Sequence, residues 1–462
     1  MLTKNVDQVV IGKSTFSVLL GLQLLHSGSN VLLLDDDRIG YGELYEKFLG
    51  ETTLWSLNSW GEDLDAKPLL NIFDYAKAVS HTYHLEAYGH STRVQLGKSP
   101  RGNMLELSRK LGYPTHQNIL PTDPGFDEEV QASLKRLGRH LYKFQSLSQL
   151  DVKTMTGQMP KELVHWAEAI VSPYFGRKQL DLNRPWDAFF YVARAIFHQK
   201  FSLDFSAAEI WHLLLEAISP RYEVDSTKLV DDLVSIYQLR GGQFKSTRVR
   251  EWMFYKASPW SLELSSYEGI IHPKKLVLMG SHTSPIGLEL DPHDHSYISV
   301  QMDFDPQAES GYDIKDEIHF LFSPNDVGTD FGLWSVRQKS SKRLEVQVAL
   351  RQREGMKIEF LHSKLLDRAQ TLLESNFPLF KAVSNDQQMQ QGREIWIDEH
   401  FHKPRRLRGE LLLPANINLR QVLSPGKTEK VRNVSYFGPG KRDRLGLISS
   451  LLDMKDALPR LQ

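Results

Sequence analysis

VVIGKSTFSVLLGLQLLHSGSNVLLLDDD, residues 9 to 37, begins with an apolar run that stops at Gly12. An amphipathic segment follows as far as Gly28, and a second apolar run, Val31 to Leu34, ends on acidic residues. Strand, turn, helix, turn and strand in this order form the βαβ unit of a nucleotide-binding sheet. The stretch therefore predicts an α/β fold built on a parallel sheet.

Two details of this unit are typical of dinucleotide binding. Gly28 follows the last periodic residue of the helix, where a left-handed C-terminal cap is expected. Asp35 follows Gly12 at close to the spacing of about 20 residues that separates the first glycine of a dinucleotide fingerprint from the acid that binds the ribose hydroxyls. We therefore expect Asp35 at an adenosine ribose.

The phosphate-binding turn departs from the fingerprint G-x-G-x-x-G, because Ser14 and Ser17 replace its second and third glycines. Serine is a mild replacement, since it is small and its hydroxyl can donate to a phosphate. The helix N-terminus still offers unpaired amides and a positive dipole end, to which Lys13 adds charge. We expect a weakened pyrophosphate site formed by Gly12, Lys13, Ser14 and Ser17.

The tetrapeptide GKST, which begins at Gly12, also spells the end of a P-loop. That motif requires another glycine at position 7, which is Asp7, and the residues between the two positions are strand-like rather than loop-like. The dinucleotide interpretation is therefore preferred.

Composition describes an ordinary globular protein. The 462 residues suggest two or three structural units, with 41% apolar and 24% charged residues. The 56 basic and 57 acidic residues give a net charge of -1, so no global charge attracts nucleic acid. The absence of cysteine excludes disulfides and thiolate sites. No apolar run approaches the ~18 residues of a transmembrane segment, and the first strand begins too early for a signal peptide, so we expect a cytoplasmic protein.

The pattern between residues 104 and 220 is helical. Apolar residues recur at three-to-four spacing in three segments: 128–144, 160–171 and 186–198. Ser206 and Glu209 form a capping box ahead of a further helix. These features predict a helical cap domain, whose aromatic residues, such as Trp166 and Phe190, are expected in its core rather than along a substrate pocket.

A second informative stretch begins at residue 227. The pattern predicts a helix over 228–239, a glycine pair at 241 and 242, one strand over 243–252, a hairpin, and a buried strand over 274–280 that returns to the first sheet.

With this stretch, the sequence resembles the FAD-dependent amine oxidase and phytoene desaturase superfamily. The resemblance rests on the N-terminal unit, on RGGQFKSTRVREW at 240–252 and on KLVLMG at 275–280. In that family a valine of the middle strand meets the adenine through its backbone, and the resemblance places Val249 there. The resemblance implies FAD as the cofactor.

The family also ends on a strand, a Gly-Asp pair and a helix. The resemblance places Gly438 at the glycine that touches the ribityl or pyrophosphate part of the flavin nucleotide, and Gly446 at the start of the last helix. Position 439 is Pro439 instead of the aspartate, and proline has neither a carboxylate nor an amide hydrogen.

The resemblance implies two domains, each discontinuous in sequence. Residues 1–60, 225–290 and 425–462 would form the FAD/NAD(P)-binding Rossmann-like domain. Residues 61–224 and 291–424 would form a substrate domain, with the helical cap and a mixed, mainly antiparallel sheet. Its strands are expected in 297–304, 317–322, 333–337 and 344–350, with a helix over 363–374.

Three polar clusters are expected to be solvated loops. Two of them combine imidazoles and carboxylates: Asp291, His293, Asp294 and His295, and Asp398, Glu399, His400 and His402. They lack a recognised ligand spacing, so we assign no metal. The third, Lys403 to Arg408, is basic, and a peripheral membrane contact is its alternative role.

Two functions remain open. The first is an FAD-dependent oxidoreductase of amine oxidase or phytoene desaturase type, acting on an apolar or amine substrate that is a small molecule or lipid-like. No catalytic residue is assigned, because flavin oxidation often needs no protein acid or base. The second is a non-catalytic binding protein that has lost FAD, as the Rab GDP-dissociation inhibitors of the same superfamily have. The serines and Pro439 favour the second function, and Asp35 favours the first.

Overall fold

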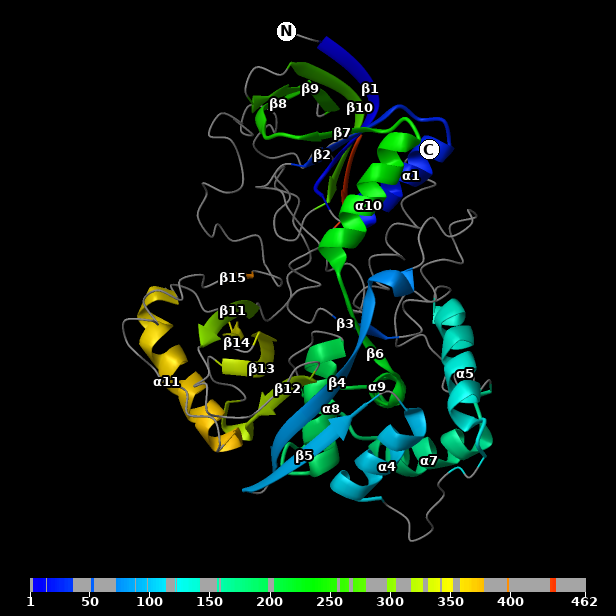
Figure 1. Cartoon of the computed structure of the whole chain (residues 1–462), viewed down its shortest axis with the longest axis vertical. Coiled ribbons are helices and arrows are strands. Elements are labelled where there is room, and N and C mark those ends of the chain that lie inside the picture. The colour runs from blue at the N-terminus through cyan, green and yellow to red at the C-terminus, as the bar shows by residue number, and fades with distance from the viewer. Residues whose placement is uncertain are drawn as a thin grey trace.

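The computed structural model has two units, which lie one above the other along the long axis of the molecule (Figure 1). The structure describes residues 3–13, 15–35, 51–53, 72–87, 89–97, 99–113, 121, 123–141, 156–157, 159–197, 203–255, 258–265, 269–279, 297–304, 317–326, 331–340, 343–351, 358–377, 397–398 and 433–437. Within these ranges, the upper unit is built on one sheet and two helices, and the lower unit on a larger sheet and the remaining helices (Figure 1).

Five strands of the upper sheet are parallel: β1 (Thr3–Ile11), β2 (Val31–Asp35), β7 (Gln243–Ser246), β10 (Ile270–Met279) and β16 (Val434–Phe437). They lie in the order β7-β2-β1-β10-β16, which is 3-2-1-4-5 when the parallel strands are counted along the chain. This is the strand order of dinucleotide-binding folds. The predicted fold class, α/β with a FAD/NAD(P)-binding Rossmann-like sheet, is confirmed.

The remaining strands of this sheet form the predicted hairpin, β8 (Val249–Tyr255) and β9 (Ser258–Leu264). Strand β10 pairs with β9 at Ile270 and Ile271 and with β16 from Leu276 to Met279. The prediction of one strand over 243–252 was wrong. The chain leaves β7 at Thr247, whose amide donates to the carbonyl oxygen of Asp35 at 3.0 Å, and β8 begins beyond that bond.

Helix α1 (Thr15–His26) ends as predicted at Gly28. Gly28 has φ +85°, and its amide donates to the carbonyl oxygen of Leu25 at 2.9 Å. The amide of Ser29 donates to the carbonyl oxygen of Leu24 at 3.0 Å. These two bonds form a Schellman motif, which aims the chain from α1 into β2.

Helix α10 (Ser226–Leu239) packs against α1 through Tyr237, whose side chain is fully buried. Its hydroxyl donates to the carbonyl oxygen of Val31 at 2.8 Å, at the start of β2. A Cβ at Gly21 would lie 2.9 Å from the Tyr237 ring, and one at Gly242 would lie 2.4 Å from it. Two glycines therefore make room for the ring that joins the two helices to the sheet.

The lower sheet has the order β15-β11-β14-β13-β12-β4-β6-β3, and β5 also pairs with β4. Its strands are β3 (Glu51–Thr53), β4 (Ala76–Ala87), β5 (His90–Leu96), β6 (Arg221–Val224), β11 (Tyr297–Phe304), β12 (Glu317–Phe322), β13 (Phe331–Ser340), β14 (Arg343–Arg351) and β15 (Ile397–Asp398). The pairing of β12 with β4 is parallel, and the other pairings are antiparallel. The sheet is mixed, as predicted, and β3 belongs to it because it pairs with β6.

The described helices of the lower unit are α4 (Pro100–Leu111), α5 (Phe126–Leu141), α7 (Lys161–Val171), α8 (Pro185–Phe197), α9 (Ala207–Ile218) and α11 (Ile358–Asn376). Helices α4 and α8 contact β5 and β4, whereas α5 packs on α4 and α7 packs on α9. The three helices expected over 128–144, 160–171 and 186–198 were therefore predicted at nearly their observed bounds. The Ser206 hydroxyl accepts from the Glu209 amide at 3.2 Å and caps α9 as expected.

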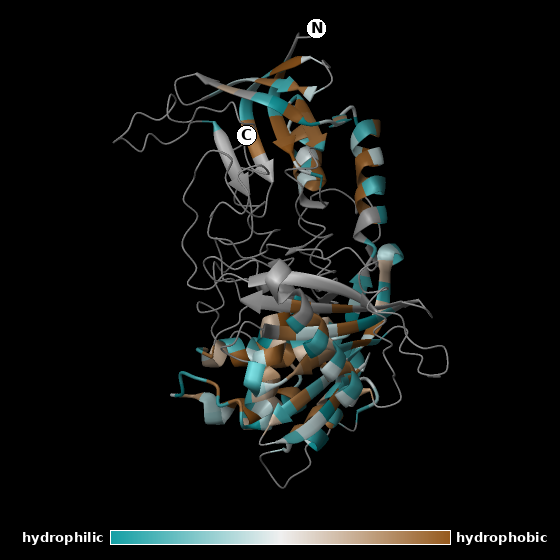
Figure 2. Cartoon of the chain, turned by 90° about the vertical axis from the view of Figure 1, so that its left-hand side faces the viewer, coloured by the Kyte–Doolittle hydropathy of each residue, from teal (hydrophilic) through white to brown (hydrophobic). Residues whose placement is uncertain are grey.

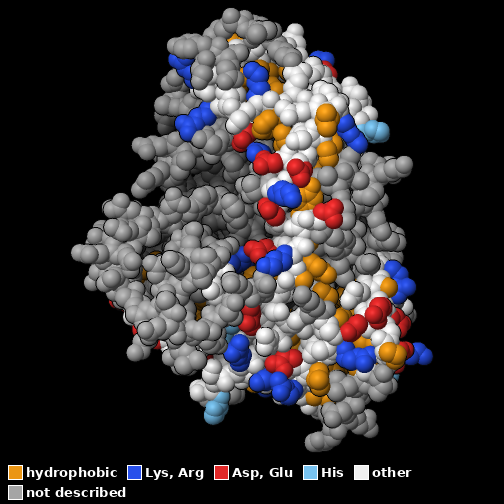
Figure 3. All heavy atoms as spheres, in the orientation of Figure 1, with side chains coloured by type: hydrophobic (Ala, Val, Ile, Leu, Met, Phe, Trp, Pro, Cys, Tyr) orange, Lys and Arg blue, Asp and Glu red, His pale blue; other side chains and the backbone are white. Residues whose placement is uncertain are grey.

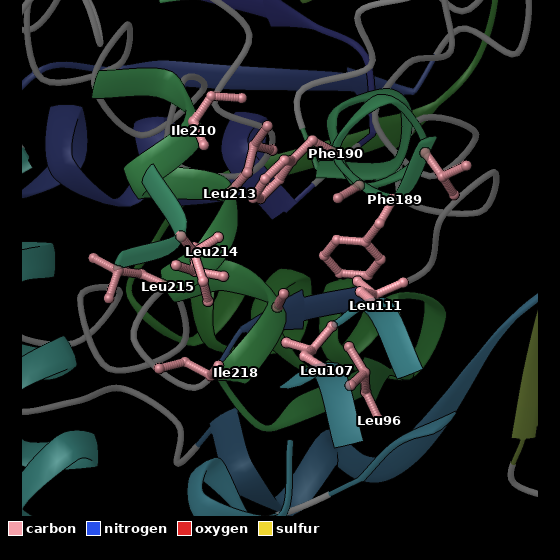
Figure 4. Close-up of a cluster of buried hydrophobic side chains, with 14 of the residues drawn as sticks. Leu96, Leu107, Leu111, Phe189, Phe190, Ile210, Leu213, Leu214, Leu215 and Ile218 are labelled. Atoms are coloured by element: carbon pink, nitrogen blue, oxygen red, sulfur yellow. The ribbon is translucent and has the colours of Figure 1, made fainter. Parts of the chain in front are cut away.

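The core of the lower unit lies between the helical cap and the sheet. Side chains of α4, α8 and α9 meet there with Leu96 of β5 (Figure 4). Trp166, Phe189 and Phe190 are fully buried, so the expectation that the aromatic residues are core residues is confirmed.

Hydrophobic residues concentrate on the strands of the upper sheet, whereas the helices show alternating hydrophobic and hydrophilic bands (Figure 2). Among the described helices, none is long and apolar enough to cross a membrane.

Candidate dinucleotide-binding site

The carboxyl ends of the parallel strands meet at one edge of the upper sheet. The strand order reverses between β1 and β10, which are neighbours in register from Thr3 and Ile270 to Ile11 and Leu278. In open α/β sheets a ligand binds outside the carboxyl ends of the strands at such a switch point. The residues that follow β1 and β2 are therefore the candidate site.

Gly12 forms the turn after β1. Its φ of +118° suits glycine alone, and its amide donates to the carbonyl oxygen of Leu34 at 2.8 Å. The chain thus stays bonded to β2 up to the turn, and α1 begins at Thr15. The first turn of α1 contains no acidic residue, so the positive dipole end of the helix faces no opposing carboxylate within the helix. Asp7 lies inside β1, which excludes the P-loop interpretation.

The structure describes one of the two serines that were predicted to contact the phosphates. Ser14 lies outside the described residues. Ser17 is in the first turn of α1 with its side chain fully buried, where it occupies the helix–sheet contact that the third fingerprint glycine would make.

Lys13 is held by helix α10. Its Nζ lies 2.8 Å from Oδ1 of Asp231, with 29% of the Lys13 side chain and 57% of the Asp231 side chain exposed. The sequence pattern predicted the cation but missed Asp231, because only the packing of α10 beside α1 brings the two residues together.

Asp35 stands at the tip of β2, half-buried, as expected for the acid that binds a ribose. Its register partner is Ser246 at the tip of β7, whose hydroxyl donates to Oδ2 of Asp35 at 3.2 Å. Thr247 follows, and its hydroxyl pairs with that of Ser265 at 3.1 Å. Ser246 and Thr247 were missed by the sequence analysis, since only the strand order places β7 beside β2.

Val249 begins β8, and its side chain is fully buried in a cluster with residues of β1, β2, β9 and β10. The pairing of β8 with β9 is irregular between Val249 and Glu251. Because the side chain faces the core, only the backbone of Val249 is placed for contact with a ligand. The chain therefore brings Asp35, Ser246, Thr247 and the Val249 backbone to one end of the sheet.

Several predicted residues lie outside the described part of the chain. Gly438 is one of them, and it follows directly on Phe437, the last residue of β16. Pro439, Gly446, the 291–295 cluster, the basic run at 403–408 and residues 399–402 are also outside it. Asp398 ends β15. In the described ranges, no group of at least 3 His, Asp or Glu side chains is arranged to hold a metal ion.

The lower unit contains a buried polar cluster that no sequence pattern indicated. Nε2 of His84 on β4 lies 3.0 Å from Nδ1 of His319 on β12. Nε2 of His319 lies 3.5 Å from Oε2 of Glu317, whose Oε1 accepts from the Thr82 hydroxyl. Burial lowers the pKa of His84 to about 4. Burial, with the nearby charges of His84 and Arg93, lowers the pKa of His319 to about 3. Both rings are therefore neutral at pH 7.

The residues at the tips of β1, β2 and β7 fit an adenine dinucleotide such as FAD. A glycine turn leads to a helix N-terminus for the pyrophosphate, and a half-buried carboxylate at the neighbouring strand tip suits the ribose hydroxyls. The hydroxyl of Ser246 orients that carboxylate.

Comparisons with known proteins give fold similarities only. No protein-family model matches the chain, and a search of curated proteins found no match. Among solved structures, an oxidoreductase from Methanosarcina mazei is 10% identical, with a TM-score of 0.47 over 98% of this chain and 100% of that chain. A putrescine oxidase redesigned for cofactor binding is 11% identical, with a TM-score of 0.43 over 100% and 99% of the two chains.

A Rab GDI from Plasmodium falciparum is 11% identical, with a TM-score of 0.41 over 79% of this chain and 86% of that chain. The chain spans only 55% of the length of another similar structure, a peptidyl tryptophan dihydroxylase. All these TM-scores are below 0.5, so the similarities assign no function.

Proposed function

We propose that the chain binds FAD at the carboxyl edge of the upper sheet and is an FAD-dependent oxidoreductase of amine oxidase or phytoene desaturase type. One observation carries the proposal. The 3-2-1-4-5 strand order puts the Gly12 turn and the Asp35 carboxylate at adjacent strand tips, beside the switch point. The same proposal includes the division into two domains, in which residues 1–60, 225–290 and 425–462 form the FAD-binding domain and the other residues form the substrate domain. Strand β3 lies within 1–60 but passes into the lower sheet.

The residues of the site have separate roles. The first-turn amides of α1 hold the pyrophosphate, and Gly12 lets the chain turn closely beneath it. Asp35 accepts hydrogen bonds from the ribose hydroxyls, while Ser246 holds its carboxylate in place. The backbone of Val249 meets the adenine, and the sequence resemblance assigns Gly438 to the ribityl chain. When bound, FAD supplies the hydride acceptor. The protein orients an apolar or amine substrate and excludes water from it.

A non-catalytic binding protein on the same fold is the second candidate. The ion pair between Lys13 and Asp231 favours it, because that cation already has an anionic partner. Pro439 favours it as well, since proline cannot donate an amide hydrogen.

The visible spectrum of the purified full-length chain tests the proposal. A yellow protein that releases FAD on heating, or that takes up added FAD with quenching of flavin fluorescence, supports the oxidoreductase. A colourless protein that is folded by circular dichroism and takes up no FAD overturns that proposal and supports the non-catalytic binding protein.

A further inference from the structure

We propose that Asp231 is a positioning residue that competes with the dinucleotide pyrophosphate for Lys13, so that the native site binds its ligand less tightly than Lys13 would otherwise allow. This inference rests on the proposed function. It concerns the strength with which the site binds an anionic ligand.

The geometry begins at the turn after β1. Lys13 follows directly on Gly12, whose φ of +118° sets the direction in which the chain leaves the strand. The ammonium of Lys13 then meets Oδ1 of Asp231 at 2.8 Å. Lys13, which directly follows the turn at Gly12, is thus paired with an acidic residue of helix α10.

Asp231 belongs to helix α10, which is fixed to its surroundings by two hydrogen bonds. Tyr237 fixes α10 to the start of β2 through its 2.8 Å bond to the carbonyl oxygen of Val31. Asp232, next to Asp231, accepts at 2.6 Å from the hydroxyl of Tyr75, which belongs to the 3-10 turn η1 (Ile72–Tyr75) that leads into β4. The carboxylate of Asp231 therefore cannot move away from Lys13 without a change of its own side-chain rotamer.

The surroundings of the pair are electrostatically mixed. Acidic and basic side chains lie interspersed over α10 and just below it (Figure 3). While Asp231 holds Lys13, attraction for the pyrophosphate comes mainly from the amides and dipole of α1, and Lys13 contributes only when it leaves Asp231. Backbone amides suffice for binding, as they do in other phosphate-binding turns, but they add no full charge.

Competition of this kind has a modest size. The pair is partly exposed, with more than half of the Asp231 side chain in contact with solvent. Exposed ion pairs are weak, so Lys13 can exchange its carboxylate for a pyrophosphate at little cost. Removal of Asp231 should therefore tighten binding by about two- to fivefold.

A double-mutant cycle on the full chain tests the proposal, with dissociation constants measured for FAD and for ADP, which shares the adenosine and the pyrophosphate. Asp231→Asn should tighten binding of both probes, and Lys13→Met should weaken it. In the Lys13→Met background, Asp231→Asn should have no further effect, because Asp231 acts through Lys13. Asp231→Glu should restore the native affinity.

Salt supplies a readout that a merely structural role would not change. Ligand binding by the Asp231→Asn variant should weaken more steeply with salt than binding by the native chain, because the Lys13 ammonium then contacts the phosphates without competition from Asp231. Asp7→Asn is the matched control: it removes an acidic partner from another lysine, Lys274, away from the carboxyl edge of the sheet, and it should leave the salt dependence unchanged.

The outcomes separate this inference from the proposed function. If the native chain binds FAD and the Asp231→Asn variant binds it equally well or more weakly, the role of Asp231 is overturned and the proposed function stands. Binding by Asp231→Asn with none by the native chain supports the role of Asp231 and overturns FAD binding by the native protein. No binding of FAD or ADP by either chain overturns both.

Discussion

The hydroxyl of Ser246 donates to Oδ2 of Asp35 at 3.2 Å and so joins the tips of β7 and β2. The bond orients the carboxylate that we place at the adenosine ribose. Asp35→Ala should weaken FAD binding by about 10- to 100-fold, because hydrogen bonds to a charged group are lost. Ser246→Ala should weaken it by about two- to fivefold, because the carboxylate remains but is less firmly oriented. Titration of flavin fluorescence measures both effects.

Asp7→Asn is the matched control for these variants. Asp7 is a carboxylate of the adjacent strand β1, bound by the Lys274 ammonium at 2.6 Å and by the Asn30 amide at 3.0 Å, away from the carboxyl edge of the sheet. Its replacement should leave FAD affinity unchanged. Unchanged affinity in Asp35→Ala would contradict the placement of the ribose.

Neighbouring glycines should respond to alanine for different reasons. A Cβ at Gly242 would lie 2.4 Å from the buried ring of Tyr237, so Gly242→Ala should destabilise the fold by about 1–3 kcal/mol through overpacking. A Cβ at Gly241 would meet nothing within 4 Å, but its φ is +88°, so Gly241→Ala should cost about 1 kcal/mol through backbone strain. Urea unfolding measures both changes.

The two mechanisms are separated by a second substitution at the ring. In a Tyr237→Leu background, Gly242→Ala should cost less than in the native chain, whereas the cost of Gly241→Ala should not change. Additive costs for Gly242→Ala and Tyr237→Leu would contradict the steric explanation.

The buried ion pair of the helical cap should matter far more than an exposed one. Arg194 Nε donates to Oε1 of Glu209 at 2.7 Å, with side chains only 0% and 8% exposed. Arg194→Met removes the guanidinium that faces the buried carboxylate and should cost about 3–5 kcal/mol of unfolding free energy. Arg109→Met is the control, because the Arg109 side chain is 66% exposed beside Glu106, and its loss should cost less than about 1 kcal/mol. Equal losses in urea unfolding would refute the distinction.

Local patterns in the sequence were sufficient to predict much of the fold. The βαβ unit, the Gly28 cap and the Ser206 cap each depend on residues a few positions apart, and the structure confirms all three. The predicted strand over 243–252 failed because its two parts pair with different strands, β7 with β2 and β8 with β9, and β2 lies far away in sequence.

The candidate site was only partly predictable for the same reason. The Gly12 turn and Asp35 belong to one local motif, so their spacing is visible in the sequence. Ser246 is 211 positions from Asp35, and His319 is 235 positions from His84. Such pairs exist only because strand order brings β7 to β2 and β12 to β4, and strand order is not encoded in any local pattern.

The imidazole pair of the lower sheet should make stability depend on pH. Burial lowers the pKa of His84 to about 4 and that of His319 to about 3, whereas an unfolded histidine titrates near 6.5. Between about pH 6.5 and pH 4 the unfolded chain therefore binds more protons than the folded chain, so stability falls as the pH falls through this window. For His84 alone the loss is on the order of 3 kcal/mol.

The structural consequence should appear where α11 meets the sheet. Phe377 directly follows α11. The centroid of its ring lies 4.8 Å from that of the His319 ring and 5.4 Å from that of the His84 ring. Other charged groups around the pair are Glu317 and Arg93, with Asp326 and its partner Arg368 of α11 farther along the same contact. Protonation of the pair breaks its hydrogen bond, and we expect faster hydrogen exchange at the C-terminal end of α11 in acid.

A variant without the titrating rings isolates this effect. The double variant His84→Gln with His319→Gln should be less stable than the native chain at pH 7, but it should lose less of its unfolding free energy between about pH 6.5 and pH 4. His90→Gln is the control, because His90 is exposed, and its pH profile should follow that of the native chain. Urea unfolding at several pH values measures the three profiles. Parallel profiles for the native chain and the double variant would show that the buried pair does not control the response to acid.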